Sequence, residues 1–244
     1  MKPAAALLSV ALFAVAVPAF AVHFLTEENP PFNFAVGAKI SGSSAAVVQE
    51  MAKRAGVEAN FELLPWDTAY RRAPIEKDTC IFSIARLQER ERLFQWIGPL
   101  ASNKWTAYGL ASGAPAIKSE SDLRRYKIGG VKNDAKVDFL MDHGVTNIVR
   151  ADRDADNPPK LFLKKDDPNR IDLWVTSAYG APRTADAAKV KMTDLKIVYP
   201  LGEEPLYLAC SPQTAKDIVQ KLDKAFNDMQ ADGTLKKISD PFFK

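Results

Sequence analysis

The stretch of sequence that decides the fold is residues 78–100, DTCIFSIARLQERERLFQWIGPL. Its apolar run from Cys80 to Ala85 predicts a buried strand, which opens into a segment with three arginines and ends at a Gly-Pro break. Arginine keeps its charge at any working pH, and its planar guanidinium matches a carboxylate with two parallel hydrogen bonds. An arginine beside this strand end therefore belongs either to an exposed, charge-mixed turn or to a site that captures a small acid.

The first 21 residues have the pattern of a secretory signal peptide. Lys2 precedes an apolar run over residues 4–17, and Pro18-Ala19-Phe20-Ala21 supplies a small-x-small cleavage signal. The run is short for a membrane span, and no later segment approaches the ~20 apolar residues that a span needs. We therefore expect an exported mature chain that begins near Val22 and has no membrane anchor.

The mature chain is nearly balanced in charge. Of the 33 lysines and arginines, Lys2 leaves with the signal peptide, so 32 basic residues remain against 30 acidic ones. This balance gives no electrostatic case for binding nucleic acid or a membrane surface, so we expect a small-molecule partner. His23 and His143 are the only histidines and have no paired ligands in the sequence, so we expect no metal and no other cofactor.

The two cysteines, Cys80 and Cys210, both lie in apolar, strand-like runs. In an exported protein an even pair is expected to form a disulfide, and two cysteines are too few for a structural zinc site. The alternative is a pair of buried, unreactive thiols.

Strand-like and helix-like segments alternate along the chain. The first half predicts strands at 22–26, 60–64 and 80–85, with helices at 43–55 and from 65 onward. The second half predicts strands at 126–131, 147–150, 170–175, 196–199 and 206–210, with helices at 134–141, 158–165, after a Ser177 cap, and at 214–230. This order predicts an α/β fold with mainly parallel sheets flanked by helices, whose ligands bind at the carboxyl ends of strands.

Six motifs follow one another along nearly the whole mature chain: TEENPPFNF at 26–34, KISG at 39–42, Trp66, QERERLFQWIGP at 88–99, RIDLW at 170–174 and LYL at 206–208. In this order they resemble the periplasmic solute-binding proteins of family 3. These are the polar amino-acid receptors of ABC importers, with the type II periplasmic-binding fold.

The resemblance implies two lobes that close on a ligand. Lobe 1 would comprise residues 22–105 and 200–244, and lobe 2 residues 106–199, with hinges near 103–106 and 198–201. It further implies a monomeric periplasmic protein, not an enzyme, that carries a small polar solute to a membrane ABC permease. Both cysteines would then lie in lobe 1.

The family's binding residues carry over onto matching positions of lobe 1. Arg90 matches the arginine that binds the ligand's α-carboxylate, and Trp66 matches an aromatic wall. Phe32 lies in the loop facing that wall. Ser83 and the backbone around Ala85 stand where the family offers hydroxyl and amide contacts.

Two further positions set this chain apart from the family. Asp134 stands at a helix N-terminus where the family offers threonine and free amides to a carboxylate, and Ser177 replaces the aspartate that holds an ammonium. The ligand could carry an amine that reaches Asp134, Glu27 or Glu28, or it could be a small organic acid. Arg86 is either a second cleft arginine or a surface charge.

Two other functions remain open. One is a standalone accessory or sensor protein that uses the fold to bind another protein. The other is a dehydratase-like enzyme on the same scaffold, for which Glu27, Glu28 and Asp134 are the candidate acids or bases. The transport receptor is our prediction.

Overall fold

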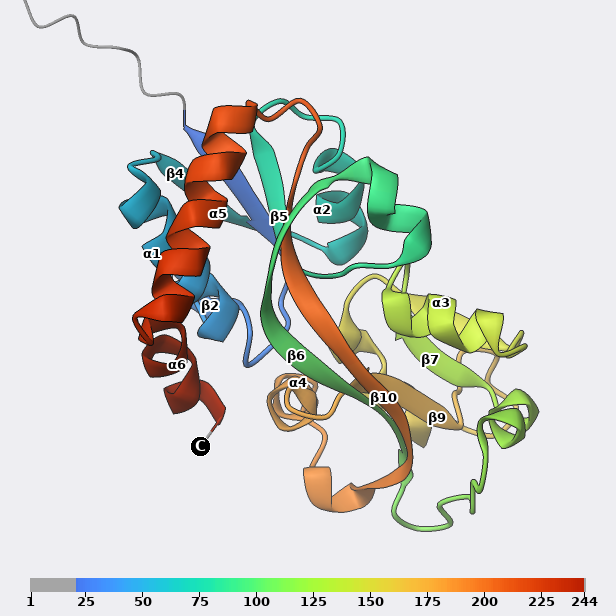
Figure 1. Ribbon diagram of the computed structural model, residues 1–244. Helices are drawn as coiled ribbons and strands as arrows, with labels where there is room; N and C mark the ends of the chain where they lie inside the picture. The colour runs from blue at the N-terminus through green and yellow to red at the C-terminus, as the bar shows by residue number, and fades with distance from the viewer. Residues whose placement is uncertain (1–20, 244) are drawn as a thin grey trace, which may run out of the picture.

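The computed structural model describes residues 21–243 (Figure 1). The predicted signal peptide, residues 1–21, lies outside this range except for its last residue. Within the described range, no helix combines the length and apolar character needed to cross a bilayer. The chain has the predicted α/β fold, in which two lobes are joined by two long strands, β6 (Gln95–Leu110) and β10 (Leu195–Cys210).

One mixed sheet runs through both lobes in the order β4-β1-β5-β10-β6-β9-β7-β8. Its remaining strands are β1 (Val22–Thr26), β4 (Ala59–Leu63), β5 (Thr79–Ala85), β7 (Ile128–Val131), β8 (Ile148–Ala151) and β9 (Leu173–Ser177). We call the end with β4, β1 and β5 lobe 1 and the end with β9, β7 and β8 lobe 2. Each end pairs its strands in parallel, and the antiparallel β6 and β10 lie between them.

The two connecting strands differ from the sequence prediction. Separate strands at 196–199 and 206–210 were expected, and the residues between them include Pro200, Gly202 and Pro205, which are uncommon inside strands. In the structure β10 is continuous, and its register against β6 shifts at irregularities, one of them between Pro200 and Gly202. Bulges of this kind let the strand bend and twist while it continues into the other lobe.

Lobe 1 packs helices against both faces of its sheet. One apolar cluster joins the sheet to α1 (Ser43–Ala55) and α5 (Lys216–Ala231), and another joins the opposite face to α2 (Trp66–Arg72). Helix α1 ends at Gly56, as predicted, where a φ of 63° gives the left-handed conformation that glycine adopts without strain. The hairpin of β2 (Phe34–Val36) and β3 (Lys39–Ser41), and the final helix α6 (Thr234–Ser239), complete this lobe.

A disulfide joins Cys80 of β5 to Cys210 of β10, which confirms that prediction. The two residues are directly opposite each other in the antiparallel pair, and both are fully buried. The bond closes a loop of 130 residues in sequence, and its two ends lie within lobe 1. It therefore fastens β10 to lobe 1 without bridging the two lobes.

Lobe 2 has shorter helices, α3 (Ala135–Asp142) and α4 (Ala181–Ala187). Two predictions are wrong here. The helix expected at 158–165 is a 3₁₀ segment that covers only Pro158–Phe162. Ser177 does not cap a helix, since it ends β9 and α4 begins only after Gly180.

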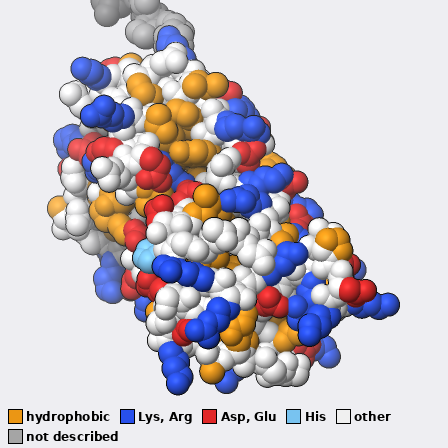
Figure 2. All heavy atoms as spheres, turned by 90° about the vertical axis from the view of Figure 1, so that its right-hand side faces the viewer, with side chains coloured by type: hydrophobic (Ala, Val, Ile, Leu, Met, Phe, Trp, Pro, Cys, Tyr) orange, Lys and Arg blue, Asp and Glu red, His pale blue; other side chains and the backbone are white. Residues whose placement is uncertain are grey.

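The remaining 3₁₀ helices are η1 (Gln88–Leu93), η2 (Glu120–Arg125), η3 (Asp154–Asp156), η5 (Met192–Asp194) and η6 (Asp240–Phe243). The face of the molecule that includes α2 and α3 mixes acidic and basic side chains with scattered hydrophobic ones (Figure 2). Charge on this face is thus interspersed rather than gathered into a field of one sign, in keeping with the balanced composition.

Candidate ligand-binding site

A small cavity of about 20 Å³ lies where the two lobes meet. Its lining includes six of the residues predicted from the sequence: Glu27, Trp66, Ser83, Ala85, Arg90 and Asp134. The other lining residues are Asn29, Asn103, Trp105, Ala135, Lys136 and Leu206. Residues from both lobes and from the connecting strands thus meet at one point.

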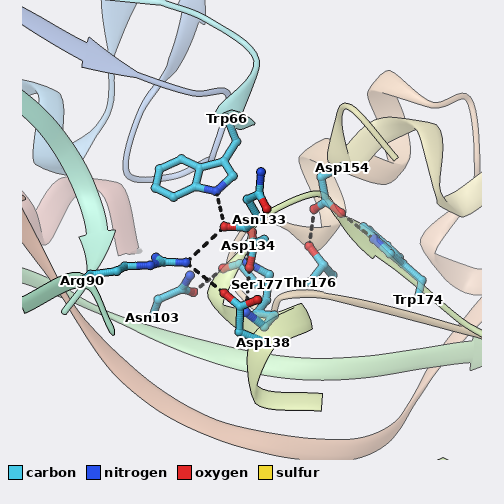
Figure 3. Close-up of polar contacts among 11 residues, drawn as sticks. Trp66, Arg90, Asn103, Asn133, Asp134, Asp138, Asp154, Trp174, Thr176 and Ser177 are labelled. Carbon is cyan, nitrogen blue, oxygen red and sulfur yellow. Dashed lines mark hydrogen bonds and ion pairs between the residues drawn. The ribbon is translucent and has the colours of Figure 1, made fainter. Parts of the chain in front are cut away.

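Arg90 is the main charged group that lobe 1 brings to this cavity. It lies in η1, just after β5, and only 2% of its surface is exposed. Its Nη2 donates to the carbonyl oxygen of Asn133 and to Oδ2 of Asp138, each at 3.1 Å (Figure 3). Its Nε and Nη1 are buried and make no hydrogen bond within residues 21–243. Two nitrogens, on different sides of the guanidinium, are therefore available to acceptor atoms of a ligand.

Ser83 reaches the cavity because of an irregularity in β5. Its φ is 63°, which is unusual for a residue other than glycine, and it lies where the pairing of β5 with β10 shifts register. A bulge re-aims the side chain of the extra residue. The hydroxyl of Ser83 is buried and has no hydrogen-bond partner in the described chain, so it is a second polar group available to a ligand.

Direct hydrogen bonds close the cleft beside Arg90. The indole Nε1 of Trp66, in lobe 1, donates to the carbonyl oxygen of Asn133, in lobe 2, at 2.7 Å. Asn133 also donates through Nδ2 to Asp67 of lobe 1. The Trp66 ring stacks on Tyr70, with centroids 5.5 Å apart, and is 4% exposed. The structure is therefore a closed conformation in which the loop after β7 contacts α2.

The lobe 2 side of the cavity carries an ion pair within a single turn of chain. Asp134 caps α3 by accepting the backbone N–H of Lys136 on Oδ1, and its Oδ2 accepts from Lys136 Nζ, both at 2.8 Å. The two side chains are 8% and 10% exposed. Burial acts to lower the pKa of Lys136, but neighbouring carboxylates, Asp134 foremost, raise it above its ordinary value, so the lysine stays charged.

Two further carboxyl groups lie in the cleft. Burial, followed by the neighbouring charge of Asp134, raises the pKa of Glu27 to about 8, so this side chain is mostly protonated at neutral pH. Asp154 accepts hydrogen bonds from Trp174 Nε1 at 2.7 Å and from the hydroxyl of Thr176 (Figure 3). The site therefore combines two fixed cations with carboxyl groups that are protonated or already hydrogen-bonded.

A larger pocket of about 710 Å³ adjoins this cavity, and Glu27 and Trp66 line both. Its wall includes the apolar stretch Leu63-Leu64-Pro65. Its acidic lining residues outnumber the basic ones and are Glu27, Glu28, Asp152, Asp154, Asp156 and Asp186 against Arg153 and Arg183. The pocket has room for most of a small ligand whose anionic end enters the cavity.

Three predicted site residues lie away from the cavity. The Phe32 ring is fully buried against the rings of Tyr179 and Phe243, so it joins the lobes at another point. Arg86 forms an exposed ion pair with Glu91, with contacts of 2.7 and 2.5 Å. Neither side chain lines the cavity.

Ser177 is also removed from the cavity, although it is close. Its hydroxyl donates to Oδ1 of Asn103 at 2.6 Å, and Asn103 lines the cavity (Figure 3). Ser177 thus positions a neighbouring polar group and does not meet the cavity itself.

Among the lining residues that sequence reasoning missed, Asn103, Trp105 and Lys136 bring polar side-chain groups. The Nε1 of Trp105 is buried without a hydrogen-bond partner among the described residues. Lys136 was not singled out, although a lysine two residues after a helix-capping aspartate is within reach of that carboxylate. Among residues 21–243, no group of three or more His, Cys, Asp or Glu side chains is placed to hold a metal ion.

The fold and sequence have clear relatives. A curated relative, the "Probable amino-acid-binding protein YxeM" of Bacillus subtilis, is 26% identical over 230 residues, covering 89% of this chain and 81% of the relative. An ancestral arginine-binding protein bound to arginine superposes with a TM-score of 0.77 at 21% identity, with 92% of this chain and 98% of that chain covered. A histidine kinase sensor domain with similarity to periplasmic binding proteins superposes with a TM-score of 0.79 at 15% identity, with 91% of this chain and 95% of that chain covered.

At such identities the two structures establish the fold and leave the ligand undetermined. The match to a family of sequences is more decisive, since it extends over nearly the whole described chain. The family description "Bacterial extracellular solute-binding proteins, family 3" matches residues 22–244, and the chain belongs to that family.

Proposed function

We propose that this protein is a periplasmic receptor that captures a small, carboxylate-bearing polar solute between its lobes and delivers it to a membrane ABC importer. The observation that carries the proposal is the guanidinium of Arg90, which is buried and leaves Nε and Nη1 without a partner. A buried, charged donor of this kind is costly unless an acceptor reaches it, and a carboxylate oxygen is a strong, charge-assisted acceptor.

The surroundings of Arg90 support a ligand site. Ser83 Oγ and Trp105 Nε1 are buried, lack hydrogen-bond partners in the described chain and line the same cavity. Trp66 supplies an aromatic wall shared with the larger pocket. Lobe closure would be the signal to the permease, with hinges in β6 near 103–106 and in β10 near 198–201, between lobes 22–105 plus 200–244 and 106–199.

Delivery to an importer and export to the periplasm are part of the proposal. The family description places its members outside the cell, and the relative from Bacillus subtilis is named as an amino-acid-binding protein. We propose that this chain acts as a monomer.

A thermal-shift screen of residues 22–244 against amino acids, polyamines and small organic acids tests this function. A ligand that binds only the folded state at 100 times its dissociation constant stabilises it by ~2.7 kcal/mol, which is roughly 5–10 °C at this chain length. We expect a shift from a carboxylate-bearing class, together with a smaller radius of gyration in solution scattering if the free protein samples open states. No shift from any of these compounds would refute the receptor function.

The closed cleft favours one other function, that of an accessory or sensor module that binds another protein. Trp66, Asp67 and Arg90 already bond directly to the loop after β7, so protein groups by themselves hold the lobes together. A protein of this type would keep the same scattering profile with every small molecule, whereas the receptor changes its profile with its solute.

A further inference from the structure

We propose that Lys136 fills the place of a ligand's ammonium group, so that the cleft selects carboxylates without an α-amino group over the corresponding amino acids. This inference rests on the proposed function, because it takes Arg90 as the group that binds the ligand's carboxylate. It assigns Lys136 as the residue that determines specificity. The favoured ligands are 2-oxo acids, hydroxy acids and related organic acids.

The first observation is that both carboxylate oxygens of Asp134 already accept a hydrogen bond from Lys136. Oδ1 accepts the backbone N–H of Lys136 and Oδ2 accepts its Nζ, both at 2.8 Å. Both side chains line the cavity and are nearly enclosed. The lysine ammonium therefore occupies the position in which a ligand's ammonium would meet this carboxylate.

The second observation concerns the other carboxyl groups near the cavity. An α-amino group is one carbon away from its carboxylate, so with the carboxylate on Arg90 it must lie close to the cavity. There, Asp138 is already paired with Arg90 at 3.1 Å. Asp154 is held by Trp174 and Thr176. Glu27 is mostly protonated at neutral pH because of burial and the charge of Asp134, which raise its pKa to about 8.

The third observation is that the unpaired buried groups of the cavity are donors. Arg90 offers Nε and Nη1 and Trp105 offers Nε1, while the hydroxyl of Ser83 can donate or accept. Buried donors without partners are costly, so the preferred ligand is rich in acceptors. A carboxylate followed by a keto or hydroxyl oxygen presents acceptors where an amino acid presents a cation.

An amino acid can enter only by displacing Lys136. Displacement breaks the buried ion pair of Lys136 with Asp134, and a buried charge without a partner is strongly unfavourable. The ligand's ammonium would then only give Asp134 the same positive partner that the lysine had supplied. The lysine must also find a new place outside a nearly enclosed pocket. We therefore expect an amine-free acid to bind at least about tenfold more tightly than the amino acid of the same skeleton.

Matched pairs of ligands test this selectivity by titration calorimetry: pyruvate with alanine, 2-oxoglutarate with glutamate, and phenylpyruvate with phenylalanine. In the wild type the best-fitting pair should favour the oxo acid at least about tenfold. In Lys136→Met the side chain keeps a similar length without the charge, so Asp134 becomes free to accept an ammonium. The preference should shift toward the amino acid by at least about tenfold.

Two further variants make the test specific. Lys132→Met removes one positive charge from the same loop, where Lys132 is exposed and pairs with Asp152, and it should keep the wild-type preference. Asp134→Asn combined with Lys136→Met removes both charges and keeps a capping oxygen on α3. This double variant should fold if Lys136→Met alone does not, and it should show no gain for amino acids.

Two results would overturn the inference while leaving the receptor function intact. One is a wild type that binds the amino acid of the best pair more tightly than the oxo acid. The other is a Lys136→Met variant with an unchanged ratio. Failure of every compound in both series to bind the wild type would overturn the proposed function itself, and the selectivity with it.

Discussion

Glu27 gives this protein an unusual dependence of stability on pH, which Glu27→Gln should remove. Burial in the cleft and the charge of Asp134 raise its pKa from 4.5 to about 8 in the folded protein. The folded state therefore holds a proton between these values that the unfolded state releases. The stabilisation that this proton provides is fully present below pH 4.5. It is lost as the pH rises from there through 8, with a slope of up to ~1.4 kcal/mol per pH unit for this group.

The whole pKa shift corresponds to a change in the free energy of unfolding of at most ~5 kcal/mol. Because the charge of Lys136 acts to lower the same pKa, we expect a change of a few kcal/mol. Gln at position 27 keeps the shape of the protonated acid and cannot ionise. The melting temperature of Glu27→Gln relative to wild type should thus rise by roughly 5–15 °C between pH 5 and pH 9. Asp138 and Asp154, whose burial also raises their pKa values, act equally in both proteins and cancel.

Calorimetric melting of both proteins at half-unit steps from pH 5 to pH 9 gives the difference directly. Glu28→Gln is the matched control, because Glu28 is adjacent in sequence and exposed. Its difference from wild type should be flat over this range. If the difference in melting temperature between Glu27→Gln and wild type stays constant from pH 5 to pH 9, Glu27 is an ordinary ionised carboxylate. The electrostatic account of the cleft would then be wrong.

Three other perturbations have defined outcomes. Replacing Cys80 and Cys210 together by alanine should lower the free energy of unfolding in urea by ~2–4 kcal/mol, and reductant should bring the wild type to the same urea midpoint as the variant. Equal midpoints of variant and wild type in oxidising buffer would contradict this. Gly180→Ala places a Cβ 2.3 Å from the carbonyl oxygen of Pro30 in the other lobe, so it should destabilise the closed conformation by ~1–3 kcal/mol. The radius of gyration in solution scattering should increase, and an unchanged radius would count against contact between the lobes at Gly180 and Pro30. Trp66→Phe keeps an aromatic ring but removes the 2.7 Å hydrogen bond across the cleft, so it should weaken solute binding by ~1 kcal/mol in calorimetry. Binding equal to wild type would show that this hydrogen bond has no part in closure.

The sequence was most informative where local rules and tertiary packing agree. The apolar run before Arg90 predicted β5, and the pair of cysteines in apolar strands predicted the disulfide that the structure contains. Helix α1 and its end at Gly56 followed from an apolar stripe and a glycine in the left-handed region. Arg90 and five other predicted residues line one cavity because each follows a strand end or lies at a bulge.

The sequence was least informative where the two lobes meet. Lys136 resembles any solvated lysine on a short helix, and its burial depends on the approach of lobe 1, which periodicity does not report. Phe32 was placed near the ligand, but its ring packs on Tyr179 and on Phe243, far apart in sequence. Pro200 suggested a break in β10, where the strand bends and continues into the other lobe.

The central claim is that Arg90 binds the carboxylate of a solute, and titration calorimetry of Arg90→Gln tests it most directly. The ligand for this experiment is the compound that raises the melting temperature of the wild type most. Arg92→Gln is the control, since Arg92 belongs to the same 3₁₀ helix and is exposed. We predict that Arg90→Gln loses ~3–5 kcal/mol of binding free energy, or roughly 10²–10⁴-fold in affinity, while Arg92→Gln binds like wild type. An Arg90→Gln variant that binds as tightly as wild type would contradict the account.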